Sequence, residues 1–317
     1  MEYTRTYSIR KGEYFADALK RAGKEFIPTN CIINKLLPGL GATHCELIAP
    51  RKSIIIEPNV PVIESKAKKH KNALAVYKGV TVRKIIDFLE DNHDRHYKLL
   101  TTPESFAKIK EAMQTVGIDM YEECFILFDE CEKLVQDVHY RDSIREPMND
   151  FFLFQNKALI SATPIIPEKD NRFDGFARVL IQPDYAYRQK LKLITTNNVL
   201  ETLQEVIEAK RGTVCIFCNS IDSIDSFYRL IPELSNACTF CSEDGQYKLW
   251  KGNRRKKSMM ITELERYNFF TSRFYSAVDI ISPNPPHVIF ISDLFGATQS
   301  VIDPATEAIQ IIGRFRG

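Results

Sequence analysis

Residues 125–132 read Phe125-Ile-Leu-Phe-Asp129-Glu130-Cys131-Glu132, an apolar run that ends in carboxylates. The run has the length and composition of a strand that is buried on both faces, as in a parallel sheet covered by helices. Such sheets bind ligands at the carboxyl ends of their strands. The sequence therefore predicts a ligand-binding edge at Asp129 and Glu130, where carboxylates suit a magnesium ion. The alternative is a solvated acidic turn that follows a strand.

Short apolar runs alternate with helix-period segments on both sides of this run, which is typical of an α/β fold with parallel sheets. Helices are predicted at 82–92, 103–116 and 198–210, the second with Thr102 as its cap and Pro103 at its first position. Strands are predicted at 53–57, 73–77, 98–101, 124–128, 157–160, 192–195, 213–217, 238–241, 268–271 and 288–292.

The chain length of 317 residues allows two domains of about 150 residues, each with its own core. A polar segment that contains a proline, residues 182–190, lies between the two series of predicted strands and is the expected linker. The expected domains are therefore residues 1–182 and 190–317. The order of elements indicates the same α/β plan used twice.

A glycine-rich turn, residues 38–43, precedes a predicted helix that starts near His44. In a phosphate-binding loop, glycines let backbone N–H groups approach the phosphates, a lysine reaches the β- and γ-phosphates, and a Ser or Thr hydroxyl holds magnesium. Here an alanine stands in the lysine position, and Lys35 or His44 is a candidate for the missing charge. Taken alone, the turn could equally bind no nucleotide. The candidate nucleotide-binding residues are Gly39, Leu40, Gly41, Ala42, Thr43 and His44.

Further motifs follow in a fixed order after the glycine-rich turn and the Asp129-Glu130 box. They are Ser161-Ala162-Thr163, Phe270-Thr271-Ser272-Arg273 with Asp279, and Gln310-Ile-Ile-Gly313-Arg314-Phe-Arg316. In this order the motifs resemble those of superfamily 2 helicases and translocases. The resemblance extends from about residue 34 to residue 317. It implies two RecA-like parallel-sheet domains of the P-loop NTPase type, the second apparently truncated.

This resemblance implies an ATP-dependent helicase or translocase that hydrolyses ATP–Mg²⁺ in a cleft between the two domains. Thr43 and Asp129 would hold the magnesium ion, and Glu130 would act as general base. The resembled motif usually has His or Asp at the position of Glu132. Whether Glu132 contacts the Ser-Ala-Thr motif is therefore left open. Asp279 would approach the ribose or the arginines. The implied catalytic residues are Asp129, Glu130, Gln310, Arg314 and Arg316, with the choice of arginine finger left open.

The same resemblance places nucleic-acid contacts at strand ends, where hydroxyl and amide groups bind phosphates without reading sequence. A helix cap or turn is the alternative for each, above all for Thr102. Two basic clusters, 66–71 and 254–257, are either solvated loops or further contacts. The expected polymer is DNA rather than RNA. The implied contact residues are Pro58, Asn59, Thr101, Thr102, Ser220, Thr271 and Ser272.

The composition, 44% hydrophobic and 26% charged, is that of an ordinary globular protein, and the net charge of +2 neither requires nor excludes nucleic acid. No apolar run approaches the roughly 20 residues that a membrane span needs, and the N-terminus does not resemble a signal peptide. A cytoplasmic protein without a membrane partner is expected, as a monomer or an oligomer of unknown size.

Eight cysteines are present, and Cys215-x2-Cys218 and Cys238-x2-Cys241 have the spacing of a zinc site. The first pair, however, lies in an apolar strand pattern, where residues three apart point to opposite faces. Buried cysteines that behave as small hydrophobic residues are therefore favoured over zinc.

Two rival interpretations remain for the whole chain. The missing loop lysine suggests a catalytically degenerate, helicase-like module that binds nucleic acid without turning nucleotide over. The group of Asp129, Glu130 and Glu132 would also suit a metal-dependent nuclease for single strands.

Overall fold

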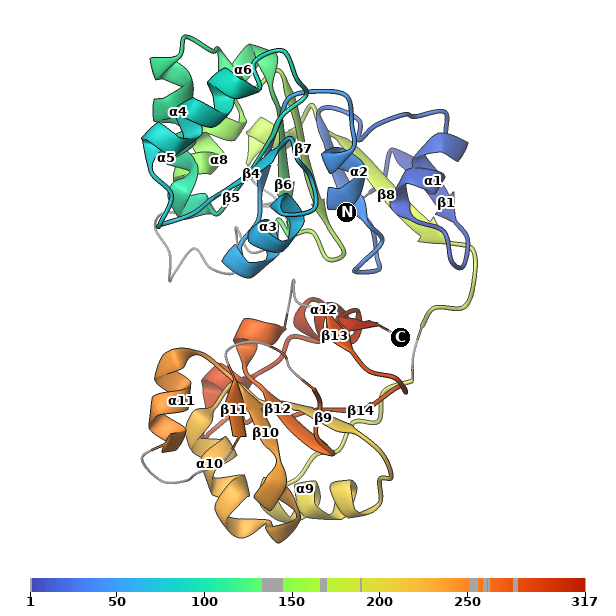
Figure 1. The fold of residues 1–317 in the computed structure, drawn as a ribbon. Helices are drawn as coiled ribbons and strands as arrows, with labels where there is room; N and C mark the ends of the chain where they lie inside the picture. Colours follow the sequence, from blue (N-terminus) through green and yellow to red (C-terminus); the bar gives the residue numbers. More distant parts are fainter. Residues whose placement is uncertain are drawn as a thin grey trace. The chain divides into compact units, whose positions relative to one another are not determined.

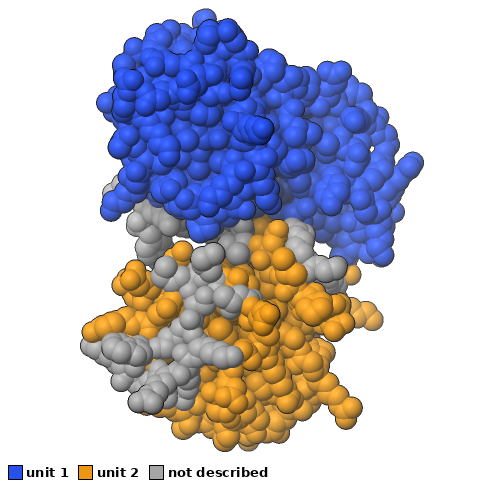
Figure 2. All heavy atoms as spheres, viewed as in Figure 1, with its two compact units in different colours: residues 1–187 blue, residues 188–317 orange. Residues whose placement is uncertain are grey.

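The computed structural model describes the chain except for residues 1, 133–144, 166–169, 189, 251–255, 259–260, 262, 276–278 and 317. The side chains of residues 145–146, 250, 256–258 and 316 also lie outside the description. The chain forms two compact units, residues 1–187 (unit 1) and 188–317 (unit 2). Figure 1 shows the elements of each unit, and Figure 2 shows which residues belong to each.

Unit 1 is built on one parallel sheet. Its strands lie in the order β1-β8-β2-β7-β6-β3-β5-β4, and each neighbouring pair runs parallel. The central strands are continuous apolar runs, as expected for a sheet that is buried on both faces. The strands are β1 (Arg5–Ile9), β2 (Cys31–Asn34), β3 (Ser53–Ile56), β4 (Ala73–Val76), β5 (Lys98–Thr101), β6 (Phe125–Asp129), β7 (Asn156–Ser161) and β8 (Ala177–Pro183).

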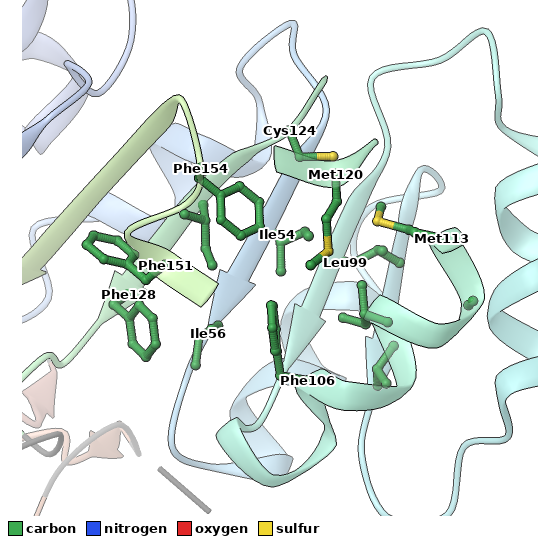
Figure 3. Packing of buried hydrophobic residues seen from close by; sticks show 14 of the residues in the cluster. Ile54, Ile56, Leu99, Phe106, Met113, Met120, Cys124, Phe128, Phe151 and Phe154 are labelled. Atoms are coloured by element: carbon green, nitrogen blue, oxygen red, sulfur yellow. The ribbon is translucent and has the colours of Figure 1, made fainter. Parts of the chain in front are cut away.

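Helices cover both faces of this sheet (Figure 1). Because strand side chains alternate, Ile54 and Ile56 enter one core cluster and Ile55 enters the other. Figure 3 shows the first cluster, in which Phe106 and Phe151 pack with the isoleucines of β3. Each such buried side chain contributes about 1.5–3 kcal/mol. The helices are α1 (Phe15–Arg21), α2 (Ala42–Leu47), α3 (Val60–Ala67), α4 (Val82–Asp91), α5 (Phe106–Thr115), α6 (Met120–Glu123) and α8 (Arg145–Phe151).

Unit 2 has a smaller parallel sheet, in the order β11-β10-β12-β9-β14, and a two-stranded pair, β13-β15. The strands are β9 (Val214–Phe217), β10 (Cys238–Phe240), β11 (Lys256–Ser258), β12 (Tyr267–Phe270), β13 (Ile280–Ile281), β14 (His287–Phe290) and β15 (Phe315–Arg316). The helices are α9 (Val199–Glu208), α10 (Ile221–Leu230), α11 (Glu243–Trp250) and α12 (Glu307–Ile312).

The α/β class and the parallel sheets are confirmed, and nine of the ten predicted strands exist to within about two residues. The prediction of a strand at 192–195 is wrong. That segment has no strand in the structure, and Leu193 is 85% exposed, because an apolar alternation forms a strand only where a neighbour pairs with it. Strand β8 runs to Pro183, so the first residues of the expected linker belong to the sheet, and the boundary between the units falls after Tyr187.

Two helix starts also differ from the predictions. Helix α2 begins at Ala42, inside the glycine-rich turn, and not near His44. The segment predicted as a helix at 103–116 begins with a 3-10 turn, Pro103–Ser105, and continues as α5. Thr102 occupies the cap position of this turn, but its side chain makes no capping hydrogen bond.

Candidate active site

The carboxyl edge of the unit 1 sheet carries a cluster of buried charged groups. Strands β2, β7, β6 and β3 are consecutive neighbours in the sheet and run parallel. Their last residues therefore lie along one edge, and so do the residues that follow them. This topology places Lys35, Glu57, Glu130 and Ser161 at the same edge as Asp129.

Asp129 is the centre of the cluster. The Lys35 ammonium lies 3.3 Å from Asp129 Oδ1 and 3.7 Å from Glu130 Oε1. The Thr43 hydroxyl, from the first turn of α2, donates a hydrogen bond to Asp129 Oδ2. The backbone N–H of Glu130 donates to Asp129 Oδ1 over 3.0 Å. Asp129 at the end of β6 thus contacts a lysine and the threonine of the glycine-rich turn, and the same lysine also contacts Glu130.

A second lysine reaches this cluster from helix α3. Lys66 Nζ donates to Thr43 Oγ1 over 2.8 Å, and it also forms an ion pair with Glu57. Glu57 follows β3 directly and is buried. The Thr43 hydroxyl therefore lies between a carboxylate, Asp129, and an ammonium group, Lys66.

The lysines set the charge state of Asp129. Burial by itself would raise the pKa of Asp129, but Lys35 and Lys66 outweigh it and lower the pKa to about 2. Burial raises the pKa of Glu57 even though the Lys66 ammonium opposes the shift. Asp129 is therefore a carboxylate at neutral pH, and it can bind a cation without first losing a proton.

Glu132 differs from its neighbours in this respect. Burial, and then the adjacent charge of Glu130, raise the pKa of Glu132 well above its usual range. Ser161 makes a hydrogen bond to the Glu132 carboxyl group. The Ser161 hydroxyl also accepts from the backbone N–H of Thr163 over 3.0 Å. The contact between the acidic box and the Ser-Ala-Thr motif, which the sequence left open, is therefore present in this structure.

Backbone conformation shapes the site at three residues. Gly39 and Gly41 have φ angles of 74° and 78°, in the left-handed region that glycine adopts at little cost. Glu130 has a φ angle of 54°, which costs a residue with a side chain about 1–3 kcal/mol. Non-glycine residues in this region cluster at functional sites, where the surrounding structure holds them.

Other predicted residues of unit 1 have varied surroundings. Of the two candidates for the missing charge, Lys35 reaches the carboxylates, whereas the exposed His44 ring packs beside the His70 ring, 5.7 Å between centroids. Thr101 and Thr102 are buried, and the Thr101 hydroxyl donates to the Thr102 carbonyl over 2.9 Å. The remaining predicted contacts, Pro58 and Asn59, are half-buried at the start of α3.

The predicted residues of unit 2 gather at the carboxyl edge of its own sheet. Ser220 follows β9 and caps α10 by accepting from the backbone N–H of Ser223 over 3.2 Å. Thr271 and Ser272 follow β12. The Thr271 hydroxyl donates to the Phe240 carbonyl over 3.4 Å, and the Ser272 N–H donates to Asn219 Oδ1 over 3.2 Å.

The predicted finger arginine is held within unit 2. Arg314 is buried, and its guanidinium donates to the Gln310 side-chain oxygen over 2.7 Å and to the Gln310 carbonyl over 3.0 Å. Asp279 is exposed. The backbone of Arg316 belongs to β15, and its side chain lies outside the described part of the chain.

The chain matches no protein-family model and no curated protein. Its structure is similar to the ATP-dependent Type ISP restriction-modification enzyme LlaBIII bound to DNA, with a TM-score of 0.53 and 13% identity over 91% of this chain and 25% of that one. At this identity the similarity is one of fold. The chain spans about a quarter of the length of LlaBIII.

Two DEAD-box proteins have lower structural similarity to this chain. The yeast DEAD-box splicing factor Prp28 has 13% identity and a TM-score of 0.36, covering 92% of this chain and 70% of that one. A DEAD box protein from the hyperthermophile Methanococcus jannaschii has 13% identity and a TM-score of 0.41, covering 90% of this chain and 78% of that one.

The cysteine pairs of unit 2 are divided between the two faces of its sheet. Cys215 and Cys238 pack in one core cluster, and Cys218 and Cys241 pack in the cluster on the other face of the sheet. Within the described ranges, no group of three or more His, Cys, Asp or Glu side chains is arranged to hold a metal ion. Magnesium is usually held by one or two carboxylates together with substrate phosphates, so such a group is not required for it.

Unit 2 has a cavity of about 500 Å³, lined by Arg211, Gly212, Thr213 and Arg266. The cavity lies where β9 and β12 begin, away from the predicted residues of unit 2.

Among the helices that the structure describes, none is long and apolar enough to cross a membrane.

The sequence did not identify Glu57 and Lys66 as members of the charged cluster. Lys66 stood out only as part of a basic stretch, and Glu57 only as the last residue of the predicted strand 53–57. Their pairing depends on how α3 packs back against the sheet, and no local sequence pattern reports this.

Proposed function

We propose that the chain is an ATP-dependent helicase or translocase. The supporting observation is the contact of Thr43 with Asp129 beside Glu130, at the carboxyl edge of a helicase-like sheet. A loop threonine and a strand-end carboxylate are the pair that holds nucleotide-bound magnesium in P-loop enzymes. The two RecA-like domains of the proposal are residues 1–182 and 190–317.

The donor set of the site fits a magnesium ion. Thr43 Oγ1 and the Asp129 carboxylate are hard oxygen ligands, and Asp129 is already ionised because of Lys35 and Lys66. The ammonium groups of the two lysines lie against these same oxygens, which is consistent with a site for cations. When bound, the metal would neutralise charge on the β- and γ-phosphates.

The chain's own residues have separate roles in this proposal. Gly39 and Gly41 let the loop backbone approach the phosphates, and Asp279 approaches the ribose or the arginines. Glu130, held by its backbone bond to Asp129, orients and deprotonates the attacking water. Arg314 or Arg316 stabilises the charge that develops on the γ-phosphate, and Gln310 holds Arg314.

We further propose that nucleic acid binds through hydroxyl and amide groups at the strand ends of both units, with DNA the expected polymer. In unit 2 the exposed Ser272 and the half-buried Asn219 lie together at the sheet edge and supply accessible groups. Such groups bind the phosphate backbone without base selectivity. Helicases and translocases need this property because they move along many sequences.

A catalytically silent, helicase-like binding module is the second candidate, and Ala42 is the observation that favours it. A charge-assisted contact to phosphate contributes about 2–4 kcal/mol in a transition state, so its loss would slow hydrolysis roughly 30- to 1000-fold. In that case the protein would bind nucleic acid and show no turnover.

The deciding experiment measures magnesium-dependent ATP hydrolysis by the purified chain, with and without single-stranded DNA or RNA. We expect hydrolysis that nucleic acid stimulates and that Glu130→Gln reduces roughly 10²- to 10⁴-fold. Glu90→Gln, at an exposed position of α4, serves as the matched control and should leave the rate unchanged. Nucleic-acid binding without turnover in the parent would support the silent module, and strand cleavage without nucleotide would support a nuclease.

A further inference from the structure

We infer that Lys66 of helix α3 supplies the positive charge that a phosphate-binding loop normally takes from its own lysine. The inference rests on the proposed nucleotide site and adds to it a phosphate-binding residue from outside the loop. Lys66 lies in the last turn of α3, 24 positions after Ala42 in the sequence. Its ammonium nevertheless lies 2.8 Å from the hydroxyl of Thr43, the residue directly after Ala42.

The loop itself cannot supply this charge. Ala42 is buried, and its methyl group packs in the core cluster beneath α2. Thr43 contributes only a hydroxyl, which already bridges Asp129 and Lys66. A cation for the phosphates must therefore come from another element, and the described structure brings two lysines to the loop, Lys35 and Lys66.

The two lysines differ in what a phosphate would require of them. The Lys35 side chain is 5% exposed, and its ammonium lies between the carboxylates of Asp129 and Glu130. Moving Lys35 to a phosphate would leave both carboxylates buried beside a weakened counter-charge, which is costly. Lys35 is therefore the counter-ion of the acidic pair.

Lys66 has more freedom to bind a ligand. Its side chain is 29% exposed, and one of its two partners is the neutral hydroxyl of Thr43. Replacing that hydroxyl by a phosphate oxygen exchanges a neutral acceptor for a charged one, and charge-assisted hydrogen bonds are roughly twice as strong. The second partner, Glu57, is buried at the end of β3 and holds the ammonium at the loop, so it acts as a positioning residue.

The alternative is that Lys66 serves only as the counter-ion of the buried Glu57 and does not contact phosphate. Other lysines of the same basic stretch provide a comparison, because Lys68 and Lys69 are exposed and directed to solvent. A general attraction between a basic surface and a nucleotide would affect Lys69 as much as Lys66. A phosphate contact would affect Lys66 alone.

The test measures the affinity of the full chain for magnesium and ATP labelled on the ribose with a fluorescent group. We expect Lys66→Met to weaken binding roughly 10- to 100-fold, the loss of one hydrogen bond to a charged group, and Lys69→Met to leave it within about twofold. Equal affinities of Lys66→Met and the parent would overturn the inference and leave the proposed function intact. Absence of binding by the parent would overturn both.

A double variant separates the phosphate contact from the ion pair. Lys66→Met leaves Glu57 buried without its cation, and this could weaken binding by disturbing the fold. The variant Glu57→Gln with Lys66→Met removes both charges and therefore restores neutrality at that position. If Lys66 contacts phosphate, the double variant binds as weakly as Lys66→Met. If the double variant regains the affinity of the parent, Lys66 acts only through Glu57 and the inference is wrong.

Discussion

The two units bury different chemistry beneath the same kind of sheet edge. Unit 1 buries seven Lys, Asp and Glu side chains, whereas in unit 2 Arg314 is the one residue with a charged side chain among the buried positions that the structure describes. In place of charges, unit 2 stacks aromatic rings under its edge. The buried charged residues of unit 1 are Lys35, Glu57, Asp129, Glu130 and Glu132 at the carboxyl edge, and Glu46 and Lys98 at the opposite edge.

The aromatic rings of unit 2 come from the last positions of neighbouring strands. Phe240, Phe270 and Phe217 are aligned in register across β10, β12 and β9. Their rings stack, with centroids 4.8 Å apart for Phe240 and Phe270 and 4.9 Å apart for Phe217 and Phe270. The residues that follow them are neutral, such as Thr271 and Cys218.

This difference indicates that the two units have different roles. Buried ion pairs seldom add to stability, because removing two charges from water costs about as much as their attraction returns. A fold that was selected only for stability would have no reason to collect five buried charged residues at the carboxyl edge, and the proposed phosphate and metal site gives such a reason. Unit 2 instead has hydrogen-bonding groups next to the stacked phenylalanine rings, together with one arginine that is hydrogen-bonded to its own helix.

The largest effect should come from removing the cation at the centre of the charged cluster. Lys35→Met leaves Asp129 and Glu130 buried without their nearest counter-charge, so we expect unit 1 to lose about 3–5 kcal/mol of unfolding free energy. The matched change in unit 2, Arg314→Met, should cost about 1–3 kcal/mol, because it removes the hydrogen bonds that the guanidinium donates to Gln310.

Urea unfolding can follow the two units separately. Trp250 is the only tryptophan of the chain and belongs to unit 2, so its fluorescence reports that unit, while circular dichroism reports both. Equal losses in the Lys35→Met and Arg314→Met variants would contradict the contrast between the units.

A second effect should appear at the opposite edge of the unit 1 sheet. Lys98 begins β5, is fully buried and donates to the carbonyls of Ala49 and Arg51 over 2.9 and 2.7 Å. Burial lowers the pKa of Lys98 from 10.5 to about 8, although Glu46 opposes the shift. Between pH 8 and 10.5 the unfolded chain therefore binds more protons at this residue, and stability from Lys98 rises with pH.

The test measures the unfolding free energies of the parent and of Lys98→Met across this pH range. The difference between them should increase by about 2 kcal/mol in favour of the parent as the pH rises. Using the difference cancels the titration of other groups, which both proteins share. A difference that stays constant from pH 7.5 to 10 would show that Lys98 has its ordinary pKa in the folded protein.

A smaller effect tests the stacked phenylalanine rings of unit 2. Phe270→Leu removes the central ring of the stack, and we expect a loss of about 1–2 kcal/mol in the transition that Trp250 fluorescence detects. The control in unit 1 is Phe128→Leu, where the ring has an edge contact with Phe151 at 5.5 Å. That variant should move the circular dichroism transition and leave the Trp250 signal unchanged.

Strands that are buried on both faces were predictable from the sequence, because a short apolar run such as residues 125–128 has few other uses in a soluble chain. Strands β1, β2, β8, β11, β13 and β15 were missed. Arg5–Ile9, for example, is a polar strand at the edge of the sheet, and β8 is its one neighbour among the described strands. Pairing partners far away in the sequence decide such segments.

The candidate site was predictable to a similar extent. Thr43, Asp129 and Glu130 belong to motifs whose order indicates the fold, and the structure brings them together. Lys66 and Glu57 could not be found in this way, since a lysine in a polar helix end is ordinarily solvated. The change of a loop lysine to Ala42 raised the question of a missing charge, and only the packing of α3 provides an answer.

The smallest effect concerns Ser220, which has two possible roles in unit 2. Its hydroxyl accepts from the backbone N–H of Ser223 at the start of α10, so Ser220→Ala should cost about 1 kcal/mol of stability. Ser220→Asp should keep that stability, because aspartate caps helices as well as serine does. If the residue also touches a nucleic-acid phosphate, the added negative charge should weaken the binding of single-stranded DNA several-fold, while Ser220→Ala weakens it less. Equal DNA affinity in the parent and Ser220→Asp would assign Ser220 to capping alone, and the contacts of unit 2 would then rest on Thr271 and Ser272.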